Sequence, residues 1–364
     1  MRRRVLASLV ALLCLAGSGP LPARESDREV ANFLETTEAS QQKVELGLAF
    51  LARHQHPDGS IGSDDKEPEG GAGFKVAITS LACLSFMANG NLPGRGKYGE
   101  NVRLGLKYIL FCAKRSTAGF ITEPMGSRSR MHGHGYATMF LAEILGMTEG
   151  TALQGFKEVK QALIRAVAVI EESQTRYSKE YGGWGYEPSA DMPDEASVTV
   201  TAVQALRAAR NAGILVDSRV VDKAVEYVKR CFDPKEGSYR YSIAMNRSHS
   251  TLALTSAAVS CLNYLGEYEG EEVEKGMEYI VTHIRMLRGR NTGHYFYEAF
   301  YTSLATYNAG GTYWQTWCPQ IREELVRTAR SDGSWEGEYD NEYCTAFATL
   351  ILQMPNRYLP IFQR

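Results

Sequence analysis

The chain has 364 residues and a net charge of −2, and its 40 lysine and arginine residues are scattered along it. Because these basic residues form no patch or stripe, the composition argues against nucleic acid or an anionic membrane surface as a partner. The seven cysteines lie far apart without Cys-x-x-Cys spacing. We expect all of them except Cys14 to be buried free thiols, although disulfides stay possible if the protein is exported.

Residues 1–23 are predicted to be a secretory signal peptide. They combine an arginine-rich start, an apolar run from Val5 to Ala16 and small residues downstream, with cleavage expected after Ala23 or Ser18. This run is too short to span a membrane, and no other run reaches the roughly 18 apolar residues required. We therefore expect a spacer over residues 24–40 and an exported protein, periplasmic or extracellular, without a transmembrane segment.

Amphipathic and apolar segments alternate along the mature chain. In the first segment of each pair, apolar residues recur every three or four positions, as do Val44, Leu48 and Leu51, while charged residues occupy the other face. The second segment is apolar on nearly every side, as in 76–88 and 250–265, so it must be covered all round. Since strand signals are nearly absent, the sequence predicts an all-α fold.

Glycine-containing turns recur about every 55 residues, which is the period of a repeat architecture. Amphipathic helices outside and apolar helices inside predict two concentric rings over residues 41–364. An open solenoid is the competing geometry, but its last repeat should carry a polar cap, and the C-terminal LILQMPNRYLPIF is apolar. We therefore predict a closed α/α toroid of about six helical hairpins. The turns are HPDGSIG (56–62), STAGFI (116–121), EYGGWGY (180–186), PKEGSYRY (234–241), NTGHYFY (291–297) and SDGSWEG (331–337).

Three of these turns share a local pattern: Phe50-Leu51-x-x-x-Gln55-x-x-x-Gly59-Ser60, Gln174 with Gly182-Gly183-Trp184, and Asp332-Gly333-Ser334-Trp335. The pattern resembles the repeat of squalene cyclases and protein prenyltransferase β subunits, in which a glutamine is followed by Gly-x-Trp. The resemblance implies a terpenoid cyclase-like α/α toroid, here as an exported bacterial member. It also implies that Gln174, Trp184 and Trp335 are structural and tie an outer helix to its neighbours.

The catalytic motifs of the resembling proteins are incomplete in this chain. Class II terpene cyclases protonate an alkene with Asp-x-Asp-Asp, whereas Asp64-Asp65 and Asp194-Glu195 both lack the leading aspartate. Protein prenyltransferases hold zinc with Asp-x-Cys and a histidine from the next inner helix, but the nearest match, Glu342-Tyr343-Cys344, lies in the last repeat. Thioester-forming toroids need Cys-Gly, which does not occur. We expect no metal and no cofactor.

Ligands of such toroids sit in the central cavity, which the starts of the inner helices surround. In MHGHG, His132 and His134 could bind a metal or pass a proton, or they could belong to a solvated, glycine-rich turn. Asp194 and Glu195 could form an acid–base pair if one carboxyl is buried, or Asp194 could be the N-cap of the next helix. Glu143 lies in an apolar inner helix, where we expect a structural hydrogen bond.

The richest aromatic cluster spans residues 295–301 and includes Glu298. The rings of Tyr297 and Tyr301 could stabilise a carbocation or stack on a sugar, or they could be ordinary packing. His249 could face the cavity or cap the helix that follows it, and Glu342 is a further cavity candidate.

Two classes of function follow from this site. We expect an exported protein that binds an apolar small molecule or a protein partner in the cavity or on one face. The alternative is an enzyme of the cavity. A terpene cyclase-like isomerase would use Asp194 or Glu195 as its proton donor, with Tyr297 and Tyr301 as walls. A carbohydrate-active enzyme would use paired carboxylates such as Glu195 and Glu298.

Overall fold

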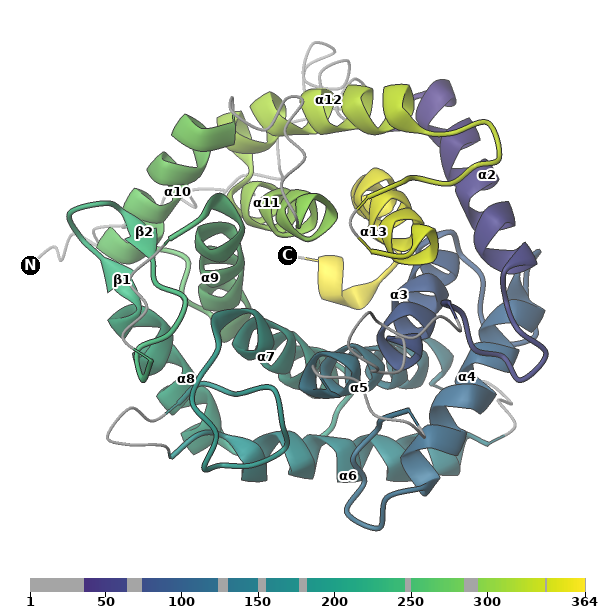
Figure 1. The fold of residues 1–364 in the computed structure, drawn as a ribbon, viewed down its shortest axis with the longest axis horizontal. Coiled ribbons are helices and arrows are strands. Elements are labelled where there is room, and N and C mark those ends of the chain that lie inside the picture. The colour runs from purple at the N-terminus through teal and green to yellow at the C-terminus, as the bar shows by residue number, and fades with distance from the viewer. Residues whose placement is uncertain are drawn as a thin grey trace, which may run out of the picture.

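Twelve α-helices form two concentric rings in the computed structural model, which describes residues 36–63, 74–123, 130–149, 155–176, 182–245, 250–284, 294–337 and 339–363 (Figure 1). The outer helices are α2 (Glu38–Arg53), α4 (Gly99–Lys114), α6 (Phe156–Ser173), α8 (Ser218–Arg230), α10 (Glu271–Ile284) and α12 (Gly311–Thr328). The inner helices are α3 (Lys75–Ala88), α5 (Arg130–Thr148), α7 (Ala196–Asn211), α9 (Leu252–Leu265), α11 (Tyr295–Ala309) and α13 (Asn341–Gln353).

Sequence polarity decides which helix lies inside. Every residue of α3 after Lys75 is buried, because neighbouring inner helices cover two sides and outer helices a third. In α8, by contrast, only Val220, Ala224, Tyr227 and Val228 are buried, on one stripe. The predicted arrangement of inner and outer helices is therefore confirmed.

The ring closes between its last and first hairpins. Helix α13 packs against α2 and α3, and α12 packs against α2, so no gap separates the two ends of the repeat array. The predicted closed toroid of six hairpins is confirmed. The other regular elements of the described residues are a two-residue strand pair, β1 (Phe232–Asp233) with β2 (Ser238–Tyr239), and the 3₁₀ turns η1 (Met354–Asn356) and η2 (Pro360–Phe362). Within the described ranges, no helix is both long and apolar enough to cross a bilayer.

Each glycine turn that the structure describes forms a joint with the next outer helix. A Cβ added to Gly59 would lie 2.2 Å from the carbonyl oxygen of Leu104 on α4, and one on Gly182 would lie 2.1 Å from that of Lys223 on α8. A glutamine strengthens two of these joints: the Gln55 amide donates to the carbonyl oxygens of Gly59 and Asn101, both at 3.0 Å, and the Gln174 amide donates to those of Gly182 and Val220 at 3.1 and 2.9 Å. Only glycine permits so close a backbone approach.

Tryptophans fix two of the turns to their own hairpins, as predicted for Trp335. The Trp184 indole is fully buried and donates to the Ile170 carbonyl oxygen on α6 at 2.7 Å, and the Trp335 indole donates to that of Leu325 on α12 at 2.9 Å. Gly333 makes the joint that closes the ring, since its added Cβ would lie 2.3 Å from the Leu46 carbonyl oxygen on α2.

The structure corrects some local predictions. The MHGHG segment is not an extended or solvated turn, because α5 begins at Arg130 and includes it. The N-cap of α7 is Glu195 rather than Asp194. Helix α2 begins at Glu38, inside the predicted spacer, with a Thr37–Ser40 capping box. Six cysteines are buried free thiols, as expected. His249 and the acidic loop with Asp64 lie outside the described residues.

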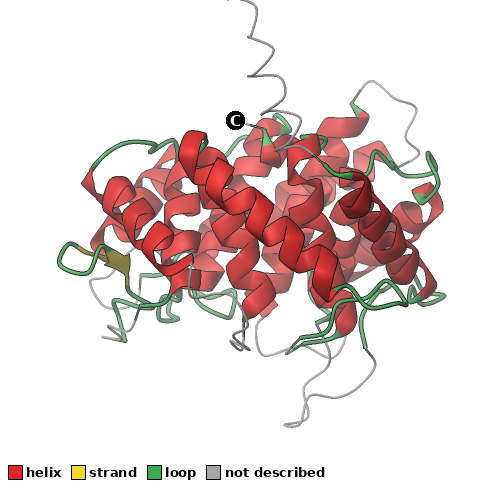
Figure 2. Ribbon diagram, turned by 90° about the horizontal axis from the view of Figure 1, so that it is seen from above, coloured by secondary structure: helices red, strands yellow, loops and turns green. Residues whose placement is uncertain are grey.

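The C-terminal segment enters the ring from one end. After α13 the chain turns through η1 and η2, and Met354, Leu359, Ile361 and Phe362 are all buried. The C-terminus therefore lies near the centre of the ring when it is viewed along its axis (Figure 1) and at one face when it is viewed edge-on (Figure 2). Because this segment follows the last inner helix, it lies at the carboxyl ends of the inner helices.

Candidate functional site

A polar cluster lies at the amino-terminal ends of α5 and α7. Glu195 caps α7, and its Oε2 accepts hydrogen bonds from the Val198 N–H at 2.8 Å and the Ser197 hydroxyl at 2.5 Å. Nε2 of His132, on the first turn of α5, lies 2.9 Å from Ser197 Oγ. The structure thus brings two predicted site residues, Glu195 and His132, together through Ser197.

Two tyrosines extend this cluster. The hydroxyls of Tyr186 and Tyr241 lie 2.6 Å apart, and the His132 ring centroid is 6.1 Å from that of Tyr186. The Tyr241 hydroxyl also interacts with the Glu195 carboxyl: burial raises the pKa of Tyr241, and the nearby carboxyl raises it further. The hydroxyl does not, however, reach Glu195 Oε1 with hydrogen-bond geometry, so Oε1 has no partner among the described residues.

Burial sets the charge of the cluster. It is the largest influence on Glu195 and raises the pKa of that carboxyl, against the hydrogen bonds from Ser197 and Val198 that lower it. Burial lowers the pKa of the His132 imidazole to about 4. At neutral pH the histidine is therefore uncharged, and the carboxyl of Glu195 holds its proton more readily than an exposed glutamate would. Since Oε2 accepts two hydrogen bonds, Oε1 is the natural position for that proton.

Aromatic side chains of α11 face this cluster across the ring. Burial raises the pKa of the Tyr297 hydroxyl, and the nearby Tyr136 and Glu195 raise it further. The Tyr297 hydroxyl has no hydrogen-bond partner among the described residues. Its ring centroid is 4.5 Å from that of Tyr301. The Tyr301 hydroxyl donates to Gln204 Oε1 at 2.8 Å and lies 3.5 Å from the Tyr136 hydroxyl. Tyr136, Gln204 and Tyr301 thus connect α5, α7 and α11 near the middle of these helices.

Two other candidates are bound into the scaffold. The Asp194 carboxylate accepts hydrogen bonds from the Tyr227 hydroxyl at 2.5 Å and from the N–H groups of Ile243 and Ala244 at 2.9 and 2.8 Å. This fully buried side chain ties the start of α7 to α8 and to the loop after β2. We infer that Asp194 is structural.

His134 is also structural, because both of its ring nitrogens bond to backbone groups. Its Nδ1 accepts from the Ile121 N–H at 3.0 Å, so its Nε2 carries the proton and donates to the Ala166 carbonyl oxygen at 3.0 Å. It thus contacts different groups from His132, although the two lie one residue apart. Over the described ranges, no group of three histidine, cysteine or carboxylate side chains is placed to hold a metal ion.

The remaining candidates lie on the inner helices. Glu298 is buried in the first turn of α11, and Glu342 is partly buried in the first turn of α13. Sequence reasoning did not single out Ser197, Tyr241 or Tyr186 as site residues. A polar residue two positions after an N-cap glutamate was the available signal for Ser197, but nothing in the sequence linked it to His132.

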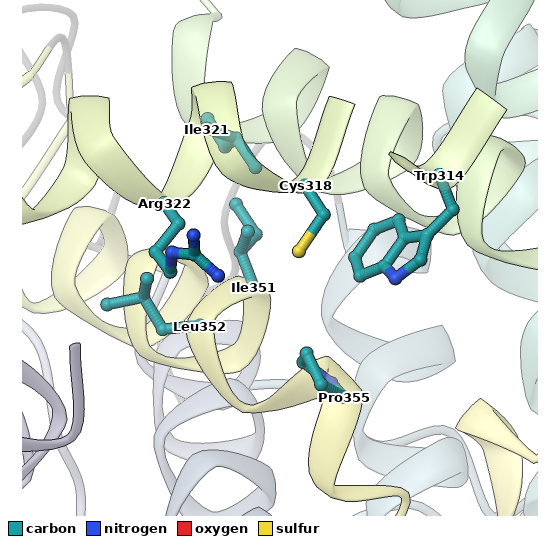
Figure 3. A pocket seen from close by; sticks show the side chains of 7 residues that line it. All are labelled: Trp314, Cys318, Ile321, Arg322, Ile351, Leu352 and Pro355. Atoms are coloured by element: carbon teal, nitrogen blue, oxygen red, sulfur yellow. The ribbon is translucent and has the colours of Figure 1, made fainter. Parts of the chain in front are cut away.

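A small cleft lies elsewhere, between α12, α13 and η1. Its volume is about 10 Å³, which is room for roughly one water molecule, so it does not hold an organic ligand. Figure 3 shows its lining, formed by Trp314, Cys318, Ile321, Arg322, Ile351, Leu352 and Pro355.

The arrangement of the helices identifies the class of fold, a terpenoid cyclase-like α/α toroid. No protein-family model and no curated protein matches the sequence. Among solved structures, the type II terpene cyclase MstE from Scytonema, in complex with geranylgeranyl dihydroxybenzoate, matches 92% of this chain and 99% of its own, with a TM-score of 0.58 and 12% identity. An alpha-amylase from Clostridium perfringens matches 86% of this chain and 97% of its own, with a TM-score of 0.56 and 10% identity. At such identities the likeness shows the fold alone, and one fold hosts unrelated activities.

Proposed function

We propose that the centre of the ring binds a small, largely apolar molecule whose polar group meets Glu195 and Tyr297. One observation carries the proposal: Glu195 Oε1 and the Tyr297 hydroxyl are both buried, interact electrostatically and have no hydrogen-bond partner among the described residues. A buried polar atom without a partner costs about 1–3 kcal/mol. A ligand that supplies one hydrogen-bonding group between them would remove that cost.

The surroundings favour an apolar body for this ligand. Beyond the two polar atoms, the interior is aromatic, with Tyr297, Tyr301 and Phe300 on α11 and Tyr343 and Phe347 on α13 in successive ring contacts of 4.5 to 5.3 Å. Aromatic walls with a few convergent polar groups are typical of small-molecule sites. We further propose that the protein acts after export, on the basis of its predicted signal peptide.

Ligand binding can be tested on the purified mature protein. Native mass spectrometry should detect a co-purifying small molecule, or intrinsic fluorescence should show saturable binding of a neutral alcohol from a panel of decanol, dodecanol, farnesol and cholesterol. Glu195→Gln and Tyr297→Phe should weaken this binding about tenfold, the value of one hydrogen bond of about 1.4 kcal/mol. Glu278→Gln, on the exposed face of α10, is the control and should bind normally.

Two results would contradict this proposal. A protein that purifies empty and binds none of the four alcohols would remove the small-molecule function. Binding that survives in both Glu195→Gln and Tyr297→Phe would place the ligand elsewhere. A protein partner, the other version of the binding function, would contact an outer face and would be insensitive to both substitutions.

A cavity enzyme is the second candidate, because burial raises the pKa of Glu195 and its Oε1 has no hydrogen-bond partner among the described residues. Since Asp194 is engaged by three donors, Glu195 is the better proton donor of the two. Protonation of an alkene would create a carbocation beside Tyr297 and Tyr301, whose faces can stabilise it. The fold shared with a terpene cyclase is compatible with this chemistry. The glycoside-cleaving alternative, with Glu195 and Glu298, stays a prediction.

The proposed role of Glu195 as a proton donor is tested by a separate experiment. The protein is incubated in D₂O with a geranylgeranylated dihydroxybenzoate, and the products are analysed by mass spectrometry. A cyclase should give an isomer that carries one deuterium, and Glu195→Gln should abolish it while ligand binding persists in part. Ser197→Ala should slow the reaction, because Oε2 loses one of its two donors. Unchanged substrate with the wild-type protein would rule out this compound as a substrate, and full activity in Glu195→Gln would exclude Glu195 as the acid.

A further inference from the structure

The C-terminal segment forms the floor of the ring. Leu359, Ile361 and Phe362 are each less than 5% exposed, and η2 packs against α5 and α7. The Phe362 ring centroid lies 6.3 Å from that of Phe300 on α11. After α13 this short segment contains only the 3₁₀ turns η1 and η2, and Tyr358 between them is exposed. With so few backbone hydrogen bonds of its own, it has a lower local stability than the α-helices around it.

Glu143 lies directly beneath this floor. Its side chain, on α5, is 1% exposed, and its Oε2 accepts one hydrogen bond, from the Ile361 N–H at 3.4 Å. That distance is long for an N–H···O bond, so it offsets little of the cost of burying a charged carboxylate. Burial raises the pKa of Glu143 to about 8, and the Ile361 N–H lowers it only in part. The predicted structural hydrogen bond therefore exists, but it joins Glu143 to η2 of the C-terminal segment rather than to a neighbouring α-helix.

The neighbours of Glu143 that the structure describes supply no compensating charge. From α9, Tyr264 interacts with it, and Arg207 of α7 lies close to Tyr264. Among the described residues, no cation on α3, α6, α7 or the C-terminal segment lies near enough to shift the pKa of Glu143. An ionised Glu143 could gain favourable solvation only if water reached it, and the C-terminal segment covers it.

We propose that the C-terminal segment is a pH-operated plug, which seals this end of the ring while Glu143 is protonated and detaches when Glu143 ionises. When the plug is detached, water reaches the carboxyl and its pKa returns toward the ordinary value of 4.5. The docked form is then most stable below about pH 4.5 and loses stability as the pH rises, by a factor of about ten per pH unit, up to the docked value of about 8. Above that pH the equilibrium levels off.

Detachment would open a second entrance to the ring. The polar cluster with Glu195 lies at the amino ends of the inner helices, and the plug lies at their carboxyl ends. The plug is thus independent of the ligand proposed for the first end, and it can be tested without any ligand.

Hydrogen exchange read by mass spectrometry tests the plug in the full mature chain. The reporter is a C-terminal peptide that contains the amides of Ile361 and Phe362, which donate to Glu143 and to the Leu359 carbonyl oxygen. After correction for the intrinsic pH dependence of exchange, its protection should fall about tenfold per pH unit between pH 5 and pH 8. Glu143→Gln, which cannot ionise, should remove this dependence, whereas Glu278→Gln should keep it.

Phe362→Ala provides a second variant in case Glu143→Gln does not fold. It should lower the protection of the plug by a constant factor at every pH and leave the slope unchanged, because Glu143 remains. The proposal is overturned by protection that does not depend on pH in the wild-type chain, or by an unchanged slope in Glu143→Gln. It is also overturned if peptides from α9 show the same slope, since the event would then be general unfolding.

Discussion

Gly333 forms the joint that closes the ring, so its replacement tests closure directly. Its φ is +93°, and an added Cβ would lie 2.3 Å from the carbonyl oxygen of Leu46 on α2. A non-glycine residue in this left-handed conformation costs about 1–2 kcal/mol. Separating the turn from a backbone atom that cannot rotate away adds about 1–3 kcal/mol. We expect Gly333→Ala to lower the free energy of unfolding by about 2–5 kcal/mol, measured by urea denaturation with far-ultraviolet circular dichroism.

Gly213→Ala is the matched control for this substitution. The φ of Gly213 is +75°, but a Cβ there would meet no atom within 4 Å, so only the backbone cost of about 1–2 kcal/mol remains. Gly182→Ala, at an internal joint, should match Gly333→Ala. If Gly333→Ala cost no more than Gly213→Ala while Gly182→Ala remained severe, the last turn would not contact α2 and the ring would be open.

Three further predictions concern the scaffold. Trp335→Ala should cost about 3–5 kcal/mol in urea denaturation, because it empties a fully buried site and leaves the Leu325 carbonyl oxygen without its donor; a loss below 1 kcal/mol would contradict this packing. Asp194→Asn should cost about 1–3 kcal/mol, because an amide nitrogen would face a backbone N–H, and an unchanged melting temperature would return Asp194 to the cavity candidates. The six buried thiols, whose pKa values burial raises, should resist Ellman's reagent until the protein unfolds, and fast reaction in the native state would contradict their burial. They are Cys83, Cys112, Cys231, Cys261, Cys318 and Cys344.

The sequence was sufficient to predict the fold because the residues that determine how each hairpin packs lie close together in the chain. A helix such as α3, apolar on all sides, can only be an inner helix. In the last turn, the contact with the next outer helix requires a glycine and the contact within the hairpin requires a tryptophan, so Gly333 and Trp335 could be assigned from a few neighbouring residues. The apolar C-terminus was read correctly as evidence against an open end, but its burial as the floor of the ring was not predicted.

The site was harder to predict because it is made by contacts between distant residues. His132 and Ser197 lie on different inner helices, and only the ring geometry brings them to 2.9 Å. Asp194 and Glu195 are adjacent acids, and which of them caps α7 depends on where the helix begins, a boundary that a sequence defines only to within a few residues. The roles of the two acids were therefore separated by the donors around Asp194, which come from α8 and from the loop after β2.

The joint between Gly333 and Leu46 also affects how the protein unfolds. In an open stack of repeats, a terminal repeat has a single neighbour and frays first, so unfolding proceeds by partial steps. Here each hairpin has a neighbour on both sides, because α12 and α13 contact α2. No hairpin can leave without breaking two interfaces, and the array has no end from which to fray. Loss of structure should thus be cooperative around the whole circle, and new chain ends cut into any one of the glycine turns should be about equally tolerated.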